Sequence, residues 1–156
     1  MFVAFFFGKL QPNFYCIMHY WLLKTEPEAF SWEDLQREGQ SHWDGVRNYA
    51  ARNHLKAMAV GDLALMYYSG KERAIVGVVR IVTAAYQDPS TDDERWVAVR
   101  IAPQRLLARH VTLDEIKTDP QLAEMVLLRI SRLSVQPVTS NEFEHILQLA
   151  DNAKHG

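Results

Sequence analysis

Three strand-like segments lie close together in the middle of the chain, and their spacing constrains the fold more than any other feature. Residues 63–69 and 74–86 are rich in aliphatic and aromatic side chains, and residues 95–103 alternate between two kinds of side chain in the manner of a half-buried strand. Short polar segments connect the three. Connections of this length favour antiparallel pairing, because a parallel crossover needs a dozen or more residues.

Further strands are predicted over residues 19–25 and 132–139, with Pro137 placing the latter at a sheet edge. Gly77 predicts a bulge or a close backbone approach within 74–86. Four candidate N-caps predict helices: Ser31 for a helix through Arg37, Asn48 for one over 49–58, and Thr112 and Thr139, each with a Glu three residues later, for two more. An ambiguous segment is expected to be helical through Met125.

The resulting order, β-α-α-β-β-β-α-β-α, lacks the strand–helix alternation of a doubly wound fold. It predicts an α+β domain in which a mostly antiparallel, barrel-like sheet is flanked by short helices. With 156 residues, the chain is the size of one domain that can bury its own core.

Composition narrows the possible partners. The formal net charge is −2, so any binding to nucleic acid must use a local basic patch or a shaped pocket. Cys16 is the only cysteine, which rules out an internal disulfide and fits a reducing compartment; we expect a cytoplasmic monomer. No apolar run reaches the roughly 18 residues that span a bilayer, so no membrane partner is expected.

Residues 1–17 include the apolar stretch "FVAFFF", which is too short for a signal sequence and has no basic residue before it. Met18 begins a segment that reads as a domain start. We therefore expect a domain over 18–150, a tail over 151–156, and an N-terminal extension that derives from an upstream start codon. The intact mass of the natively expressed protein tests this expectation.

Signatures of metal, cofactor or catalytic sites are weak. The sequence contains no G-x-G-x-x-G or G-x-x-x-x-G-K-[ST] motif, and its six histidines show neither H-x-H nor H-E-x-x-H spacing. The acidic loop "DPSTDDE" lacks the ligand spacing of a calcium loop and is expected to be solvated. We expect no metal and no cofactor. A Ser/His/Asp triad stays open, because its members meet only in space.

The segment "WDGVRNYAARN" (43–53) is the first candidate binding region. Trp43 lies in a polar turn, unlike the other tryptophans, which we expect in the core. Arg47 precedes the helix N-cap Asn48, and a helix N-terminus beside a guanidinium suits phosphate or carboxylate. Arg52 and Lys56 extend this basic face, although they are equally consistent with a solvated helix surface.

Two further places carry unexpected polar residues. Lys24 stands late in an apolar strand, and Arg132, Ser134 and Gln136 alternate along residues 132–139. Three polar side chains on one strand face indicate either a polar-lined cavity or an edge strand whose face meets water.

Several segments in consistent order resemble the EVE domain: "YWLLKTEP" (20–27), "SWEDL" (31–35), "WDGVRNYAARNHLKAM" (43–58), "VGDLALMYYSG" (60–70), "IVGVVRIVTAAYQDP" (75–89), "VTLDEIK" (111–117) and "RLSVQPVT" (132–139). The resemblance covers about residues 19–150. It implies a PUA-like fold, related to PUA and YTH domains, and binding of DNA or RNA that carries a modified base, such as a modified cytosine. It brings no catalytic residues.

On this resemblance, a base pocket and a phosphate-binding surface are assigned. The predicted pocket contains Trp21, Lys24, Trp32, Trp43, Gly45, Val46, Asn53, Tyr68, Ser69, Arg132 and Ser134, and the predicted phosphate contacts are Arg47, Asn48, Arg52 and Lys56. Tyr68 stands where the family pattern has His before Ser69, which leaves the chemistry at that position open.

The reader hypothesis predicts that Trp43→Ala and Arg47→Ala weaken binding while thermal stability stays nearly unchanged. One alternative is an enzyme that acts on a nucleotide or small metabolite in the same cavity, with Lys24 as the first catalytic candidate because burial depresses a lysine pKa. Another is a protein-interaction module, which would expose a large apolar patch.

Overall fold

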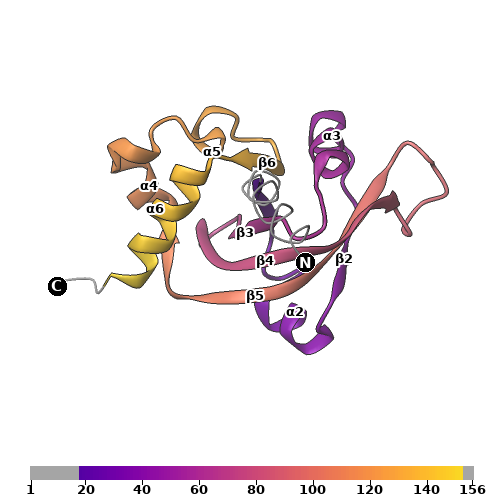
Figure 1. Cartoon of the computed structure of the whole chain (residues 1–156), viewed down its shortest axis with the longest axis horizontal. Helices are drawn as coiled ribbons and strands as arrows, with labels where there is room; N and C mark the ends of the chain where they lie inside the picture. The colour runs from indigo at the N-terminus through magenta and orange to yellow at the C-terminus, as the bar shows by residue number, and fades with distance from the viewer. Residues whose placement is uncertain (1–17, 153–156) are drawn as a thin grey trace, which may run out of the picture.

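The computed structural model describes residues 18–152, and a single six-stranded sheet organises them (Figure 1). Residues 1–17, with the predicted extension and Cys16, lie outside the described residues, as do residues 153–156 of the predicted tail. The strands are β1 (Tyr20–Thr25), β2 (Ser41–Trp43), β3 (Leu63–Tyr68), β4 (Ala74–Gln87), β5 (Val97–Thr112) and β6 (Val135–Val138). The helices are α2 (Trp32–Glu38), α3 (Tyr49–Ala57), α4 (Leu113–Thr118), the 3₁₀ turn η1 (Pro120–Leu122), α5 (Val126–Arg129) and α6 (Ser140–Asp151).

The strands are hydrogen-bonded in the order β2-β5-β4-β3-β1-β6, and every ladder except that between β1 and β3 is antiparallel. The α+β class is therefore confirmed, but the predicted barrel does not close. The edge strands β2 and β6 have three and four residues, and among residues 18–152 no ladder joins them. Pro137 in β6 has no N–H to donate, which suits the sheet edge that the sequence predicted.

The parallel pair β1–β3 matters most for the position of the functional candidates. Its crossover, residues 26–62, carries α2, β2 and α3. Because the two strands run in the same direction, their carboxyl ends meet: Lys24 pairs with Tyr67, and Thr25 with Tyr68.

Three local predictions need correction. Strand β5 continues nine residues beyond the predicted end at Pro103, because the ladder shifts register there and the extra residue accommodates a proline without an N–H. Strand β2 was missed, since three residues show no periodicity. The helix expected through Met125 is replaced by η1 and α5, separated by extended backbone at Met125.

Helix caps follow the sequence closely. Ser31, Thr112 and Thr139 form complete capping boxes, and the Asn48 side chain accepts the Ala51 N–H at 2.9 Å. Helices α4, α5 and α6 gather at one end of the sheet, whereas α2 and α3 lie toward the other (Figure 1). The sheet thus has two differently covered ends.

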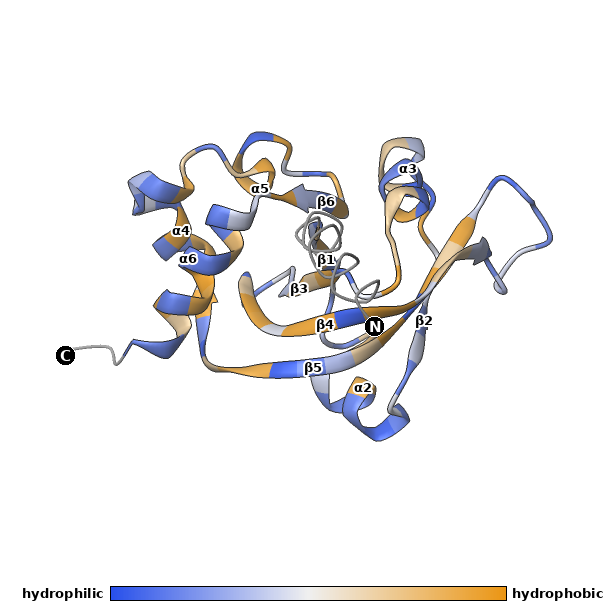
Figure 2. Cartoon of the chain, viewed as in Figure 1, coloured by the Kyte–Doolittle hydropathy of each residue, from blue (hydrophilic) through white to orange (hydrophobic). Residues whose placement is uncertain are grey.

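Buried apolar residues pack on both faces of the sheet, and strands β4 and β5 carry long apolar stretches that contrast with the hydrophilic loop joining them (Figure 2). Gly77 shows both predicted features. It stands at a register shift, and a Cβ there would lie 2.4 Å from the Trp32 ring. The indole of Trp32 therefore packs directly on the β4 backbone.

Candidate functional site

A cavity of about 530 Å³ opens where the carboxyl end of β1 faces the segment between β2 and α3. We call it the first cavity. Its walls are residues 41–47 together with Lys24, Thr25, Ala29, Phe30, Glu38 and Ser134. Both segments that the sequence singled out, 43–47 and the late part of β1, therefore contribute to one cavity.

The turn after β2 forms one wall because of its backbone. Gly45 has φ 78°, a left-handed conformation that glycine adopts without steric cost. The turn returns the chain to Val46, whose side chain is buried. Trp43 ends β2 rather than lying in a free turn, and it is only 7% exposed. Its ring meets Phe30 edge-on, 6.2 Å between centroids. Trp43 is thus a core residue with one side toward the cavity.

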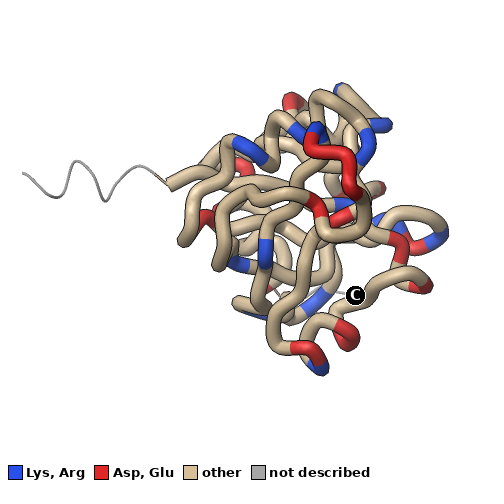
Figure 3. The backbone as a smooth tube through the Cα atoms, turned by 90° about the vertical axis from the view of Figure 1, so that its right-hand side faces the viewer, with Lys and Arg blue, Asp and Glu red and all other residues tan. Residues whose placement is uncertain are grey.

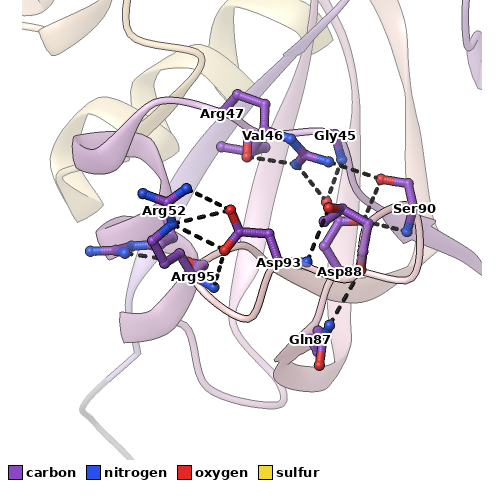
Figure 4. A network of polar contacts seen from close by, with 10 residues as sticks. Gly45, Val46, Arg47, Arg52, Gln87, Asp88, Ser90, Asp93 and Arg95 are labelled. Atoms are coloured by element: carbon purple, nitrogen blue, oxygen red, sulfur yellow. Dashed lines mark hydrogen bonds and ion pairs between the residues drawn. The ribbon is translucent and has the colours of Figure 1, made fainter.

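Asp88, a residue outside the predicted site, holds this turn in place (Figure 4). Its carboxylate side chain is fully buried. One oxygen accepts the Gly45 N–H at 2.8 Å and the Arg47 guanidinium at 2.9 Å, and the other accepts the backbone N–H and hydroxyl of Ser90 at 2.7 and 2.5 Å. Burial alone would raise the pKa of Asp88, but the hydrogen bonds from Ser90, Arg47 and Gly45 outweigh it and lower the pKa to about 2.

Arg47 is engaged within the protein more than the sequence suggested. Besides Asp88, it donates to the Val46 carbonyl at 3.0 Å and to the Ser90 hydroxyl at 3.1 Å, and its guanidinium lies 5.6 Å from the Trp96 ring centroid. Its side chain is still 40% exposed. Arg47 therefore both braces the cavity wall and presents a cation at its rim.

The polar groups that line the first cavity include three without a side-chain hydrogen bond to any residue in 18–152: the carboxylates of Glu38 and Asp44 and the hydroxyl of Ser134. His42 is already paired, with its Nδ1 2.5 Å from the Tyr86 hydroxyl. The free groups can accept hydrogen bonds from a ligand, and Ser134 can also donate one.

Lys24 also lines the first cavity. Its Nζ donates to the Ser131 carbonyl at 2.6 Å and lies 5.8 Å from the Tyr67 ring centroid. Burial lowers the pKa of the Lys24 ammonium. The same side chain also lines a second cavity, whose walls include Tyr67, Ser69, Arg73, Leu127 and Ser131.

Of the predicted base-pocket residues, Lys24, Trp43, Gly45, Val46 and Ser134 line the first cavity. Trp21 and Trp32 belong to the core instead. The Trp21 indole donates to Asp62 at 3.0 Å, and Trp32 is 2% exposed beneath Gly77. Aromatic residues of this size are most often buried to build a core, which explains both corrections.

Four other predicted pocket residues lie elsewhere. Tyr68 is buried, and its hydroxyl accepts the Trp32 N–H at 2.8 Å. Ser69 lines the second cavity. Asn53 and Arg132 are exposed and line neither cavity. In the polar alternation of residues 132–136, only Ser134 faces the first cavity, because Gln136 is buried and donates to the Leu133 carbonyl at 2.7 Å.

The four predicted phosphate contacts do not lie in one site either. Asn48 uses its side chain as the α3 cap. Arg52 lies 4.9 Å from the Tyr49 ring centroid and donates to Asn53 and to the Arg95 carbonyl. Lys56 is exposed and forms no ion pair with any residue in the described range. Only Arg47 reaches the first cavity.

Asp44 and Asp88 were both absent from the predicted site, and the sequence held a signal only for Asp44. Asp44 stands inside the quoted turn, where it was taken only as a turn former. Asp88 belongs to the loop expected to be solvated, and nothing in one sequence shows that residue 88 reaches residues 45 and 47, about forty positions away.

Neither charged residues nor potential metal ligands gather into one site among the described residues. In the view of Figure 3, acidic and basic residues are interspersed rather than gathered into one basic face. Within residues 18–152 no cluster of three or more His, Cys, Asp or Glu side chains could hold a metal ion. No helix in that range is both long enough and apolar enough to cross a membrane.

Comparison with known proteins places these features in a family. The model of the EVE domain matches residues 19–149. Mouse thymocyte nuclear protein 1 is 39% identical over an alignment that covers 86% of this chain and 75% of the mouse protein. The crystal structure of protein Atu2648 from Agrobacterium tumefaciens has a TM-score of 0.84 at 36% identity, covering 85% of this chain and 93% of that one. The crystal structure of human THYN1 protein in complex with DNA containing 5-methylcytosine has a TM-score of 0.81 at 36% identity, covering 87% and 99%.

Proposed function

Because the chain belongs to the EVE domain family, we propose that it is a DNA-binding reader that accepts a modified cytosine in the first cavity. The observation that carries the proposal is the composition of that cavity, in which aromatic and aliphatic surface faces free hydrogen-bond acceptors. Its volume of about 530 Å³ lies in the range of small-ligand sites. The human relative crystallised with DNA containing 5-methylcytosine supports DNA as the polymer.

The lining matches the chemistry of a cytosine edge. Cytosine presents an amino group that donates hydrogen bonds, and carboxylates are suitable acceptors for it. Asp44 and Glu38 supply carboxylates at the cavity. A 5-methyl group needs apolar contact, which Phe30, Trp43 and Val46 offer from the adjoining wall. Extruding a base from its stack costs a few kcal/mol, and these contacts would offset that cost.

A binding screen tests the proposal directly. The full chain is titrated with matched duplexes that contain cytosine, 5-methylcytosine or another modified cytosine at one position, and with RNA of the same sequence. We expect the tightest binding to one modified DNA duplex. Equal affinity for modified and unmodified duplexes would overturn modified-base reading, and preference for the RNA would overturn the choice of polymer.

The variant Asp44→Ala tests whether the base binds in the first cavity. Asp44 is exposed and has no structural partner among the described residues, so its loss should leave folding intact. If it accepts a hydrogen bond from the amino group that cytosine and 5-methylcytosine share, the affinity for both duplexes should fall by roughly tenfold, since such contacts are worth about 1–3 kcal/mol. Glu144→Ala, an exposed carboxylate on α6 with the same charge change, serves as control and should retain the wild-type affinity for both duplexes.

The enzyme hypothesis is tested on the same protein. Lys24 lines the first cavity, and burial lowers the pKa of its ammonium, which is the property the hypothesis required. A panel of nucleosides and nucleotides is incubated with the chain and with Lys24→Met. Turnover by the wild type that Lys24→Met abolishes would replace the reader proposal, which expects no product.

A further inference from the structure

The second cavity, of about 240 Å³, lies at the same end of the sheet as the first, between the β3–β4 turn and the segment after α5. Lys24 is the side chain that lines both. Ser69 and Ser131 add hydroxyl groups to its wall, and Tyr67 and Leu127 add apolar surface. Lys24 and Ser69 were predicted for the base pocket, but the proposed base recognition does not use this cavity.

The residues that line the second cavity carry positive charge only. Lys24 and Arg73 line it, whereas none of its lining residues is an aspartate or glutamate. The Lys24 ammonium bonds only to the Ser131 carbonyl, and the Arg73 side chain has no hydrogen bond or ion pair with any residue in 18–152. Both cations converge on Tyr67. The Lys24 Nζ is 5.8 Å from its ring centroid, and the charge of Arg73 opposes the burial that raises the pKa of the Tyr67 hydroxyl.

The backbone at Arg73 is unusual as well. Its φ of 49° makes it the one residue other than glycine with a positive φ in the described range. This left-handed conformation disfavours a side chain with a Cβ by about 1 kcal/mol, and Gly or Asn relieves the cost. The chain instead places a long cation there, in a turn that is tied to α4 by the Leu113 N–H and the Arg73 carbonyl at 2.8 Å. Strained residues of this kind cluster at ligand sites.

We propose that the second cavity is an anion subsite that takes a phosphate group, and that in a nucleic-acid complex a backbone phosphate next to the recognised base occupies it. The second half rests on the proposed function. Guanidinium, ammonium and hydroxyl groups are the donors that proteins use for phosphate, and the shared Lys24 places the two subsites side by side. An anion there would also give a counter-charge to the half-buried Lys24 ammonium, which has no ion-pair partner among residues 18–152.

The first test uses inorganic phosphate alone, so that it does not depend on DNA binding. Thermal melting of the full chain is followed as phosphate replaces chloride at constant ionic strength. The melting temperature of the wild type should rise, and Arg73→Asn should lose most of that rise. Arg80→Asn removes the same charge from an exposed position on β4 that lines neither cavity, and it should behave as the wild type does. An equal response of all three proteins overturns the anion subsite.

The second test uses the cytosine and 5-methylcytosine duplexes. Arg73→Asn should weaken binding to both by the same factor, about three- to tenfold, and reduce the slope of log affinity against log salt by about one. Asp44→Ala should also weaken binding to both duplexes but leave the salt slope unchanged, because a contact to a base edge neutralises no phosphate. If Arg73→Asn loses phosphate binding but binds DNA normally, the subsite serves a free anion and the backbone assignment is overturned. If the wild type binds no DNA while phosphate binding depends on Arg73, the proposed function fails and the anion subsite stands.

Discussion

The two cavities at the carboxyl end of β1 share Lys24 but differ in how their walls are held and in what they offer a ligand. The first has an aromatic and aliphatic wall, free carboxylates and a turn fixed by the buried Asp88. The second has two cations, two serine hydroxyls and no carboxylate among its lining residues, and Arg73 stands on an exposed turn.

The first cavity therefore suits recognition of one kind of base, and the second suits attraction of a phosphate. A mixed set of donors, acceptors and apolar surface can distinguish one base from another, because each edge presents its own pattern. A cationic cavity attracts phosphate regardless of sequence. Trp43 and Val46 in the wall of the first cavity are also part of the core, so changes to them affect stability, whereas the second cavity can lose the Arg73 cation without disturbing packing.

Trp43→Ala, in the wall of the first cavity, should have the largest effect on stability. The indole is 7% exposed and packs in the core, so its removal should lower the free energy of unfolding by about 3–5 kcal/mol. This corrects the expectation from the sequence that the substitution leaves stability nearly unchanged. Urea denaturation measures the change. A loss below about 1 kcal/mol would show that the ring is not a core element.

Asp88→Asn should have the next largest effect. The substitution keeps the size of the side chain but removes the charge that accepts hydrogen bonds from Gly45, Arg47 and Ser90. We expect a loss of about 2 kcal/mol in the free energy of unfolding and weaker binding to modified DNA. Asp92→Asn, in the same loop but exposed, is the matched control. Equal effects of the two substitutions would contradict an anchoring role for Asp88.

The pH dependence of stability should reveal the same carboxylate. The pKa of Asp88 is about 2 in the folded protein against 3.8 for an unperturbed carboxyl. A depressed folded pKa stabilises the protein above the unfolded value, and the contribution is lost as pH falls from about 4 toward about 2. Unfolding free energies measured across this window should fall less steeply for Asp88→Asn than for the wild type. Parallel curves would contradict the assignment.

Arg73→Asn should have the smallest effect on stability. Its side chain has no polar partner in the described range, and asparagine tolerates the left-handed backbone better than arginine does. We expect a change within about 0.5 kcal/mol, or a slight gain, by urea denaturation. A loss of several kcal/mol would show that Arg73 is structural, and its effect on anion binding would then need the conservative Arg73→Lys as a second variant.

Much of the fold and part of the site were predictable because the signals are local. The capping residue Asn48 and the capping boxes follow from neighbouring residues, and single residues indicated the sheet edge at Pro137 and the close approach at Gly77. The turn 43–47 and Lys24 were also found as candidates. By contrast, Trp21 and Trp32 were assigned to the pocket although they are core residues, since composition does not tell on which side of a sheet an indole packs.

The sequence by itself determined most of the elements, the family, and turn 43–47 and Lys24 as candidates, because helix caps, strand periodicity and turn residues act over a few positions. Only the tertiary structure decided that the sheet stays open, that Asp88 anchors a turn about forty residues away, and that Lys24 stands between two cavities of different chemistry. The position of Lys24 depends on the parallel pairing of β1 with β3, which juxtaposes residues that no local pattern relates.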